Sequence, residues 1–258
     1  MPRLATVNYH VHKGERQAFV LDAGGITGNL ISPELAPTKV RLSDTRDAEH
    51  TVSFSKDAVT FITSPSIVRD YSGTAWKKTY DRELTALLTK QTGAREVVVF
   101  DHTVRVDDPE ATRQPARNVH SDYSEAGARQ RLIDLIGRER AIEWSRGHYA
   151  FINVWRPIEH PINSAPLGFV RPDSIDHEDW ILIDLIYPDR KGQIMGLAGN
   201  PDHEWVYRSA MTPDEVAIFN IYDNQGLASV AHSALDMVED PTIHRVRKSI
   251  ESRTLLRY

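Results

Sequence analysis

Residues 149–158, YAFINVWRPI, open the stretch of sequence that decides the fold. From Tyr149 to the C-terminus, short apolar or alternating segments follow one another with no convincing helix between them. After the first, these segments are DWILIDLIYP, GQIMGLA, EWVYRSA, EVAIFNIYD, LASVAHSAL and SIESRTLLRY. Many short strands at regular spacing are typical of an antiparallel sandwich or barrel. The pattern therefore predicts a mainly β fold, and jelly-roll topology is one form that it can take.

Two further strands and two helices are expected upstream. EVVVFDHTVRV (96–106) is rich in β-branched residues and predicts a long strand, and ARNVHSDY (116–123) predicts a shorter one. Apolar residues recur at helical spacing over 74–93 and over 125–146, where Ser124 is a candidate N-cap. We expect these helices to flank the barrel.

The first ninety residues are mixed in character. VNYHVH, QAFVLDA, HTVSFS and AVTFITSP predict short strands. The sequence contains no internal repeat and no linker-like cluster of Pro or Gly. We therefore expect a single domain, 1–258, in which N-terminal α/β elements (1–95) precede a jelly-roll core (96–258).

The composition excludes several kinds of protein. The 258 residues include no Cys, so any protein-bound metal must be held by imidazole and carboxylate groups. A net charge of −5 argues against a nucleic-acid binder. No apolar run is long enough to span a bilayer, and the N-terminus lacks the apolar core of a signal peptide. We expect a cytoplasmic protein that binds neither nucleic acid nor membrane, and the sequence leaves open whether it is a homo-oligomer.

His120 and Asp122 form a candidate metal site in the sequence HSDY. Residues i and i+2 of a strand face the same side, so the imidazole and the carboxylate would converge at the strand's end. His232, in SVAHSALD, lies on a late predicted strand and offers a third ligand. Two His and one carboxylate on one face of a metal leave three positions open, which is typical of non-haem Fe(II) oxygenases.

A plainer interpretation of these residues competes with the metal site. A His-x-Asp sequence often arises by chance and then forms only a solvated pair. HVH at 10–12 has the same spacing but lies away from the strand-rich region, so we interpret it as structural. The strand pattern, the late His232 and the arginines that follow it favour the metal site at His120 and Asp122.

Arginines are candidates for binding a cosubstrate. A dicarboxylate such as 2-oxoglutarate chelates iron through its keto-acid end, and its distal carboxylate favours Arg over Lys. Arg247, with Ser249 beside it, and Arg253 both follow the last metal candidate. We favour Arg253 because it lies within a better strand pattern, although surface salt bridging would explain either residue. Arg156, in NVWRPI, is a third candidate, either for an oxyanion or as a structural cation stacked on Trp155.

Six segments together carry a family resemblance. They are FDHTVR, RNVHSDYSEAGARQR, FINVWRPI, NPDHEWVYRSAMTPDEVAIFNIYD, AHSALD and SIESRTLLRY. In this order they resemble the CmcJ/AsaB-like (hydroxylase/desaturase) family of non-haem Fe(II)/2-oxoglutarate-dependent oxygenases. The resemblance covers most of the chain, and the NVWRP motif with an upstream HxD and a late AHSA is specific as a set.

The resemblance implies a fold, cofactors and site residues. The fold is a double-stranded β-helix (jelly-roll) core, and the cofactors are Fe(II) and the cosubstrate 2-oxoglutarate. The family's metal positions match His120, Asp122 and His232. Its recurrent arginines match Arg156, Arg247 and Arg253.

The resemblance also implies a reaction. O2 would oxidise a C–H bond of a small, secondary-metabolite-like substrate by hydroxylation, desaturation or a related step. The loop at 236–248 is expected to border the substrate pocket. Aromatic candidates for the pocket wall, which at such spacings are more often part of the core, are Tyr123, Trp155, Tyr207 and Phe219.

Three alternatives stay open on the sequence. An Fe(II)/O2 oxidase or oxygenase of the same fold would not use 2-oxoglutarate. A cupin-like metal-dependent enzyme would also use a β-barrel, but HVH at 10–12 lacks the rest of the cupin pattern. A non-enzymatic binding module would keep the fold without the chemistry, and the intact HxD and distal His argue against it.

Overall fold

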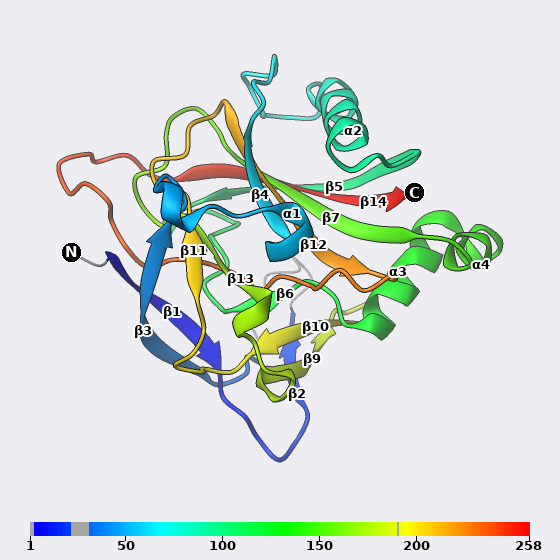
Figure 1. Cartoon of the computed structure of the whole chain (residues 1–258), viewed down its shortest axis with the longest axis horizontal. Coiled ribbons are helices and arrows are strands. Elements are labelled where there is room, and N and C mark those ends of the chain that lie inside the picture. Colours follow the sequence, from blue (N-terminus) through cyan, green and yellow to red (C-terminus); the bar gives the residue numbers. More distant parts are fainter. Residues whose placement is uncertain (1–2, 22–30, 190) are drawn as a thin grey trace.

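The computed structural model describes residues 3–21, 31–189 and 191–258, which form two sheets. The larger sheet has nine strands, in the spatial order β1 (Arg3–His10), β3 (Leu35–Asp44), β11 (Trp205–Tyr207), β8 (Leu167–Val170), β13 (His232–Ala234), β6 (His120–Ser121), β10 (Lys191–Leu197), β9 (Trp180–Ile186) and β2 (Gln17–Val20). The smaller has five, in the order β4 (Val59–Thr63), β12 (Glu215–Asp223), β7 (Tyr149–Pro157), β14 (Lys248–Arg257) and β5 (Glu96–Val106). In Figure 1 the smaller sheet crosses the top of the molecule and the larger sheet lies below it.

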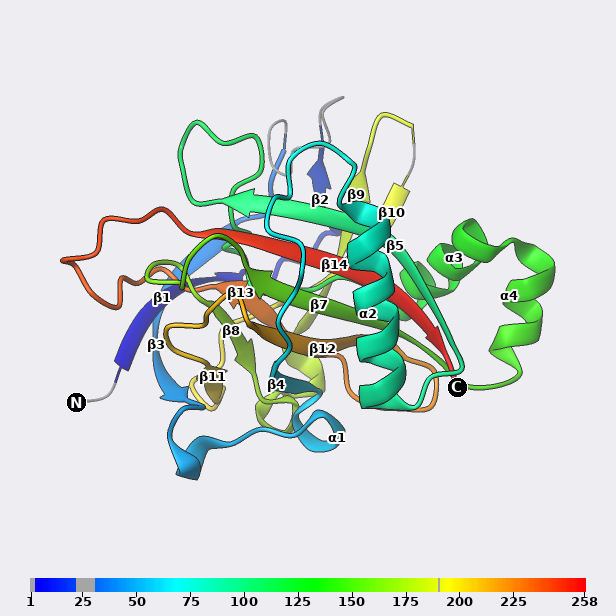
Figure 2. The same cartoon turned by 90° about the horizontal axis from the view of Figure 1, so that it is seen from above.

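Helices lie at the outside of this sandwich. They are α1 (Phe54–Asp57), α2 (Lys77–Thr92), α3 (Glu125–Ile136) and α4 (Arg138–Ser145), with three-residue 3-10 turns at Ala48–His50, Pro172–Ser174 and His177–Asp179. α2 covers the outer face of the smaller sheet, and α3 and α4 lie at one end of it (Figures 1 and 2). In the part of the chain that the structure describes, no helix has the length and apolarity needed to cross a membrane.

Strand β7 shows why the two sheets pack as they do. All nine of its residues are buried, because one face of the strand meets the larger sheet and the other meets α2. Phe151 and Trp155 point into the core between the sheets, whereas Ile152 and Val154 pack with α2. A strand buried on both faces reads as a continuous apolar run, as YAFINVW does.

The predicted fold class is confirmed, and most predicted elements are present. The long strand at 96–106 has the predicted bounds, and Ser124 is an N-cap whose Oγ accepts a hydrogen bond from the Gly127 amide at 3.0 Å. The helix expected over 125–146 is divided at Gly137, where φ is 79°. The strands that precede residue 95 join both sheets, since β1, β2 and β3 belong to the larger and β4 to the smaller.

One expectation was wrong, and two strands were not predicted. HTVSFS does not form a strand, because Phe54–Asp57 is a helical turn in which the Asp57 carboxylate accepts a hydrogen bond from the Ser53 amide at 2.8 Å. The ten-residue strand β3 was not predicted, because Pro37 and a run of charged residues hide its alternation. The strand β8 was also not predicted.

Candidate metal centre

Three candidate metal ligands meet at the inner face of the larger sheet. His120 on β6 lies directly opposite His232 on β13 in the antiparallel ladder, and their ring centroids are 4.6 Å apart. Asp122 follows β6 immediately, and its Oδ1 lies 3.5 Å from Nε2 of His120. One ligand atom from each residue lies within 4.8 Å of the other two. The structure therefore brings together the three residues expected to form a metal site.

The backbone fixes which nitrogen of each imidazole faces the cluster. Nδ1 of His120 lies 2.8 Å from the Asn118 carbonyl, and Nδ1 of His232 lies 3.4 Å from the Val230 carbonyl. Because a carbonyl only accepts hydrogen bonds, each Nδ1 carries a proton, and each Nε2 is the nitrogen that faces the cluster. Hydrogen bonds of this kind orient the histidine ligands of metal sites.

Burial and neighbouring charges set the protonation of the cluster. Burial lowers the pKa of His232 to about 3, and the nearby His120 adds to this effect, so the His232 ring is neutral at neutral pH. Burial alone would raise the pKa of Asp122. The guanidinium of Arg253 and the two imidazoles outweigh burial and hold that pKa well below its usual range. Neutral imidazoles and an ionised carboxylate are the forms that bind a divalent metal.

Arg253 fixes the carboxylate of Asp122 through one of its two oxygens. Its Nε donates to Oδ2 of Asp122 at 3.0 Å, and its two Nη atoms pair with Asp101 and Glu251, each at 2.8 Å. Asn153 on β7 donates a second hydrogen bond to Oδ2 of Asp122 at 2.8 Å. The guanidinium of Arg253 is thus shared among three carboxylates of the protein.

Arg247 lies deeper in the sandwich and has a different environment. Its side chain is fully buried, its guanidinium lies 5.1 Å from the Trp155 ring, and it donates to the Ser249 hydroxyl and the Ala165 carbonyl. Among the described residues, none places a carboxylate at ion-pair distance from it. Burial, and then the neighbouring Arg105, lower the pKa of Arg247 to about 9. A buried cation without a counter-ion is costly, so this site is suited to an anionic ligand.

Trp155 places a donor without a partner beside Arg247. Its indole Nε1 is buried and has no hydrogen-bond partner in the described part of the chain. Buried polar groups are nearly always hydrogen-bonded, and an exception points to a missing ligand or water. Arg247, Ser249 and Trp155, here called the cradle, lie together between the sheets and are a candidate anion-binding site.

Two of the predicted site residues lie elsewhere. Arg156 points away from the cluster, toward α2, where it donates to the Tyr80 hydroxyl at 3.0 Å and to two backbone carbonyls. Tyr207 is buried in a separate apolar cluster with Trp205 and accepts a hydrogen bond from Arg3. The structure does not bring either residue to the metal cluster.

The metal cluster opens into a cavity of about 1200 Å³. Tyr123 lines this cavity, whereas Phe219 packs against His232 with ring centroids 4.9 Å apart. Further residues line it that the sequence did not single out: Phe100, Arg105, Gln130, Arg131 and Gln193. The alternation of Asp101, Thr103 and Arg105 on β5 and the i, i+4 spacing of Gly127 and Arg131 on α3 could have indicated part of this lining. Phe100 lies where the register of β5 is irregular, so alternation does not predict it.

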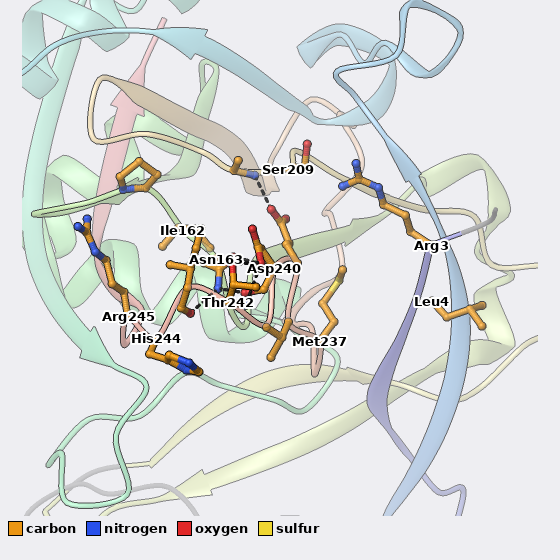
Figure 3. A pocket seen from close by; sticks show the side chains of 15 residues that line it. Arg3, Leu4, Ile162, Asn163, Ser209, Met237, Asp240, Thr242, His244 and Arg245 are labelled. Carbon is orange, nitrogen blue, oxygen red and sulfur yellow. Dashed lines mark hydrogen bonds between the residues drawn. The ribbon is translucent and has the colours of Figure 1, made fainter.

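A second cavity of about 1090 Å³ lies apart from the cluster (Figure 3). The loop expected to border the substrate pocket lines this cavity through Met237, Asp240 and Thr242, and not the cavity that contains the metal cluster. Asn163 lies at its centre and donates to the carbonyls of Asp240 and Ile243 at 2.9 and 3.0 Å. These hydrogen bonds connect the loop to Asn163 and help to fix its conformation.

The chain is similar to known oxidoreductases over most of its length. The family described as oxidoreductase/YMDC permease-like domain matches residues 7–257. The hydroxylase/desaturase efuI of Hormonema carpetanum is 30% identical over 247 residues, covering 84% of this chain and 82% of that protein. The Fe(II)/2-oxoglutarate-dependent dioxygenase nvfI of Aspergillus novofumigatus is 29% identical over 235 residues, covering 85% and 83%. A solved structure, of the iron and alpha-ketoglutarate-dependent endoperoxidase NvfI, superposes with a TM-score of 0.87 at 25% identity, covering 99% of this chain and 97% of that one.

Proposed function

The chain belongs to the hydroxylase/desaturase (CmcJ/AsaB-like) family of oxidoreductases, and from this premise we propose the residues with which it works as an Fe(II)/2-oxoglutarate-dependent dioxygenase. Its substrates are a small molecule and O2. The organic substrate is a secondary metabolite that is hydroxylated, desaturated or otherwise oxidised at a C–H bond. The observation that carries this proposal is the His120, Asp122 and His232 cluster, of which His120 and Asp122 line a cavity.

These three residues would hold Fe(II). Two imidazoles and one carboxylate match the donor set that non-haem iron prefers, and the chain offers no thiolate to compete. All three donors come from one side, since His120 and His232 are paired on adjacent strands and Asp122 is two residues from His120. The side of the site that faces the cavity stays free for exchangeable ligands.

The cradle of Arg247, Ser249 and Trp155 would bind the distal carboxylate of 2-oxoglutarate. A dicarboxylate offers the counter-ion that Arg247 lacks and an acceptor for the unpartnered Trp155 N–H. Arg253, favoured from the sequence, is less suited, because the carboxylates of Asp101, Asp122 and Glu251 already occupy it. We therefore assign Arg253 the task of positioning Asp122.

The protein's own contribution to the reaction is orientation and the exclusion of water. When bound, Fe(II) and 2-oxoglutarate supply the oxidising power for attack on a C–H bond. Arg253 and Asn153 fix the Asp122 carboxylate, and the two backbone carbonyls fix the imidazoles. Burial and the neighbouring Asp122 raise the pKa of Tyr123 to about 12, so its hydroxyl keeps its proton at the cavity wall. Phe219 and Phe169 close the apolar side of His232.

An anaerobic titration tests the assignment of metal and cosubstrate. Metal-free protein is titrated with Fe(II) and then 2-oxoglutarate, and the visible charge-transfer absorption of the chelate is followed. We expect the band in the wild type and its loss in His120→Ala. His12→Ala, which removes an exposed histidine of the similarly spaced HVH, should retain the band. Absence of the band from the wild type would refute the role of 2-oxoglutarate, and succinate release during turnover would separate this activity from an Fe(II)/O2 enzyme.

Three further expectations belong to the proposal. The chain is a single domain, supported by strands from before residue 95 that complete both sheets. It works in the cytoplasm, with neither nucleic acid nor membrane as a partner. Size-exclusion chromatography with light scattering decides between a monomer and a homo-oligomer.

A further inference from the structure

One wall of the cavity joins a cation to an apolar surface. Arg131 on α3 places its guanidinium 4.9 Å from the ring centroid of Phe100 on β5. Phe100 and Tyr123 both pack against the buried Phe151, with centroids 6.0 and 4.9 Å apart. Arg131, Phe100 and Tyr123 line the same cavity as His120 and Asp122. The wall therefore faces the space in which the organic substrate must lie.

The guanidinium of Arg131 has no carboxylate partner among the residues that the structure describes. Its neighbour Arg129 on the same helix pairs with Glu125, and Arg253 inside the cavity is shared among three carboxylates. Asp134, one turn along α3, accepts from Gln130 at 2.8 Å instead. Arg131 is thus a cation at the cavity wall that is available to an incoming anion.

The cosubstrate does not account for this cation. Along the paired strands β5 and β14, Asp101 lies opposite Arg253 and Arg105 lies opposite Ser249. Phe100 precedes Asp101, so along these two strands Phe100 and the cradle residue Ser249 lie on opposite sides of the Asp101–Arg253 pair. The proposed cosubstrate would use the cradle, which leaves Arg131 without a role in holding it.

We propose that the organic substrate is an acid whose carboxylate binds Arg131 while its apolar body lies on Phe100 and Tyr123. The planar guanidinium can receive a carboxylate through two parallel hydrogen bonds. The Tyr123 hydroxyl lies on the same wall and offers a further hydrogen-bonding group. This inference rests on the proposed function and deepens it, because it names the substrate class of that site and the residue that would bind its anionic end.

Calorimetric titration with a matched pair of probes tests the proposal. The probes are 1-naphthoate and its neutral isostere 1-naphthamide, and the protein is studied both metal-free and loaded with Mn(II) and saturating 2-oxoglutarate. We expect the loaded wild type to bind the acid about tenfold to hundredfold more tightly than the amide. Arg131→Gln should abolish this preference, Arg131→Lys should keep most of it, and Arg129→Gln should keep all of it. Thermal unfolding of each variant checks that it is folded.

The outcomes separate this inference from the proposed function. Equal affinity of the wild type for acid and amide, no binding of the acid, or an unchanged preference in Arg131→Gln would each overturn it. A preference that depends on Arg131 in metal-free protein, together with no binding of Mn(II) or 2-oxoglutarate, would support the acid site and refute the dioxygenase assignment. Binding of Mn(II) and 2-oxoglutarate without a preference for the acid would support the dioxygenase assignment and refute the acid site. Loss of stability in Arg131→Gln with the preference intact would mean that Arg131 only stacks on Phe100.

Discussion

The two oxygens of Asp122 face different partners: Oδ2 accepts from Nε of Arg253 at 3.0 Å, whereas Oδ1 lies 3.5 Å from Nε2 of His120. One oxygen is fixed by the smaller sheet and the other is presented to the metal cluster. Because Arg253 is on β14 and Asp122 follows β6, this ion pair also joins the two sheets. Arg253 would therefore influence the binding of a metal through Asp122, without contacting the metal itself.

Replacing Arg253 should lower the affinity for the metal and leave the protein folded. Arg253→Gln removes the charge that holds the pKa of Asp122 low and the hydrogen bond that aims its carboxylate. Loss of such an indirect partner typically costs about 10- to 100-fold in metal affinity. Competition with a chelating dye measures this affinity, with Co(II) as the metal. Arg257→Gln, on the same strand but paired with Glu143 near the surface, should change the affinity little. Equal affinities in the two variants would contradict the positioning role.

Replacing Arg247 should affect 2-oxoglutarate and spare the metal. Arg247→Gln removes the buried cation of the cradle, so we expect the dissociation constant for 2-oxoglutarate to rise about tenfold or more. The Fe(II) affinity of the same variant should be unchanged. The visible band, titrated with 2-oxoglutarate, measures the first quantity, and dye competition measures the second. Arg245→Gln is the control, since Arg245 is exposed and lines the other cavity. An Arg253→Lys variant that retains Asp122 in place but loses 2-oxoglutarate binding would favour Arg253 instead.

The metal-free protein should lose stability as the pH falls below about 6.5. Burial lowers the pKa of His232 to about 3 and of His10 to about 4, whereas both residues titrate near 6.5 in the unfolded chain. Between these values the unfolded state binds protons that the folded state does not, so stability is full above pH 6.5 and falls as the pH drops. Two such groups lower the free energy of unfolding by about 4 kcal/mol at pH 5 relative to pH 8.

Urea unfolding at pH 8 and pH 5 measures this difference. His10→Leu should remove about half of it, because His10 is one of the two buried groups with a lowered pKa. The substitution also removes the long contact between His10 Nε2 and Asn118 Nδ2 at 3.4 Å, which affects both pH values alike. An unchanged pH dependence in His10→Leu would show that other groups are responsible.

Gly196→Ala should damage the site through packing alone. Gly196 on β10 lies opposite His120 on β6. A Cβ at Gly196 would come within 2.6 Å of both the His10 ring and the Ile183 side chain. Overpacking of this kind costs about 1–3 kcal/mol. Gly192→Ala, on the same strand, meets nothing closer than 3.7 Å and is the control. Chemical unfolding gives the stability, and we also expect weaker Fe(II) binding in Gly196→Ala, since His120 must shift with its strand.

Local sequence patterns revealed the strands and the ligands but not the pairing of charges. The β-branched run of β5 and the cap at Ser124 depend on neighbours in sequence, so they could be predicted. His120, Asp122 and His232 could be suggested because alternation puts i and i+2 on one face. The choice between Arg247 and Arg253 depended on carboxylates more than a hundred residues distant, such as Asp101 and Asp122, and no local pattern encodes them. Arg156 was expected to be able to bind an oxyanion. Its strand is buried on both faces, and no local pattern shows that Arg156 lies on the face toward α2.

The two-residue strand β6 has a consequence for the assembly of the metal site. It pairs with both β10 and β13, so His120 meets His232 from a strand that lies more than a hundred residues later in the chain. A segment that ends before β13 would carry His120 and Asp122 but would lack the third ligand. Metal binding is therefore coupled to the folded sandwich and would stabilise it without guiding the early steps of folding. Loss of the metal would leave a folded but less stable protein, which makes the supply of metal a determinant of how long each molecule survives.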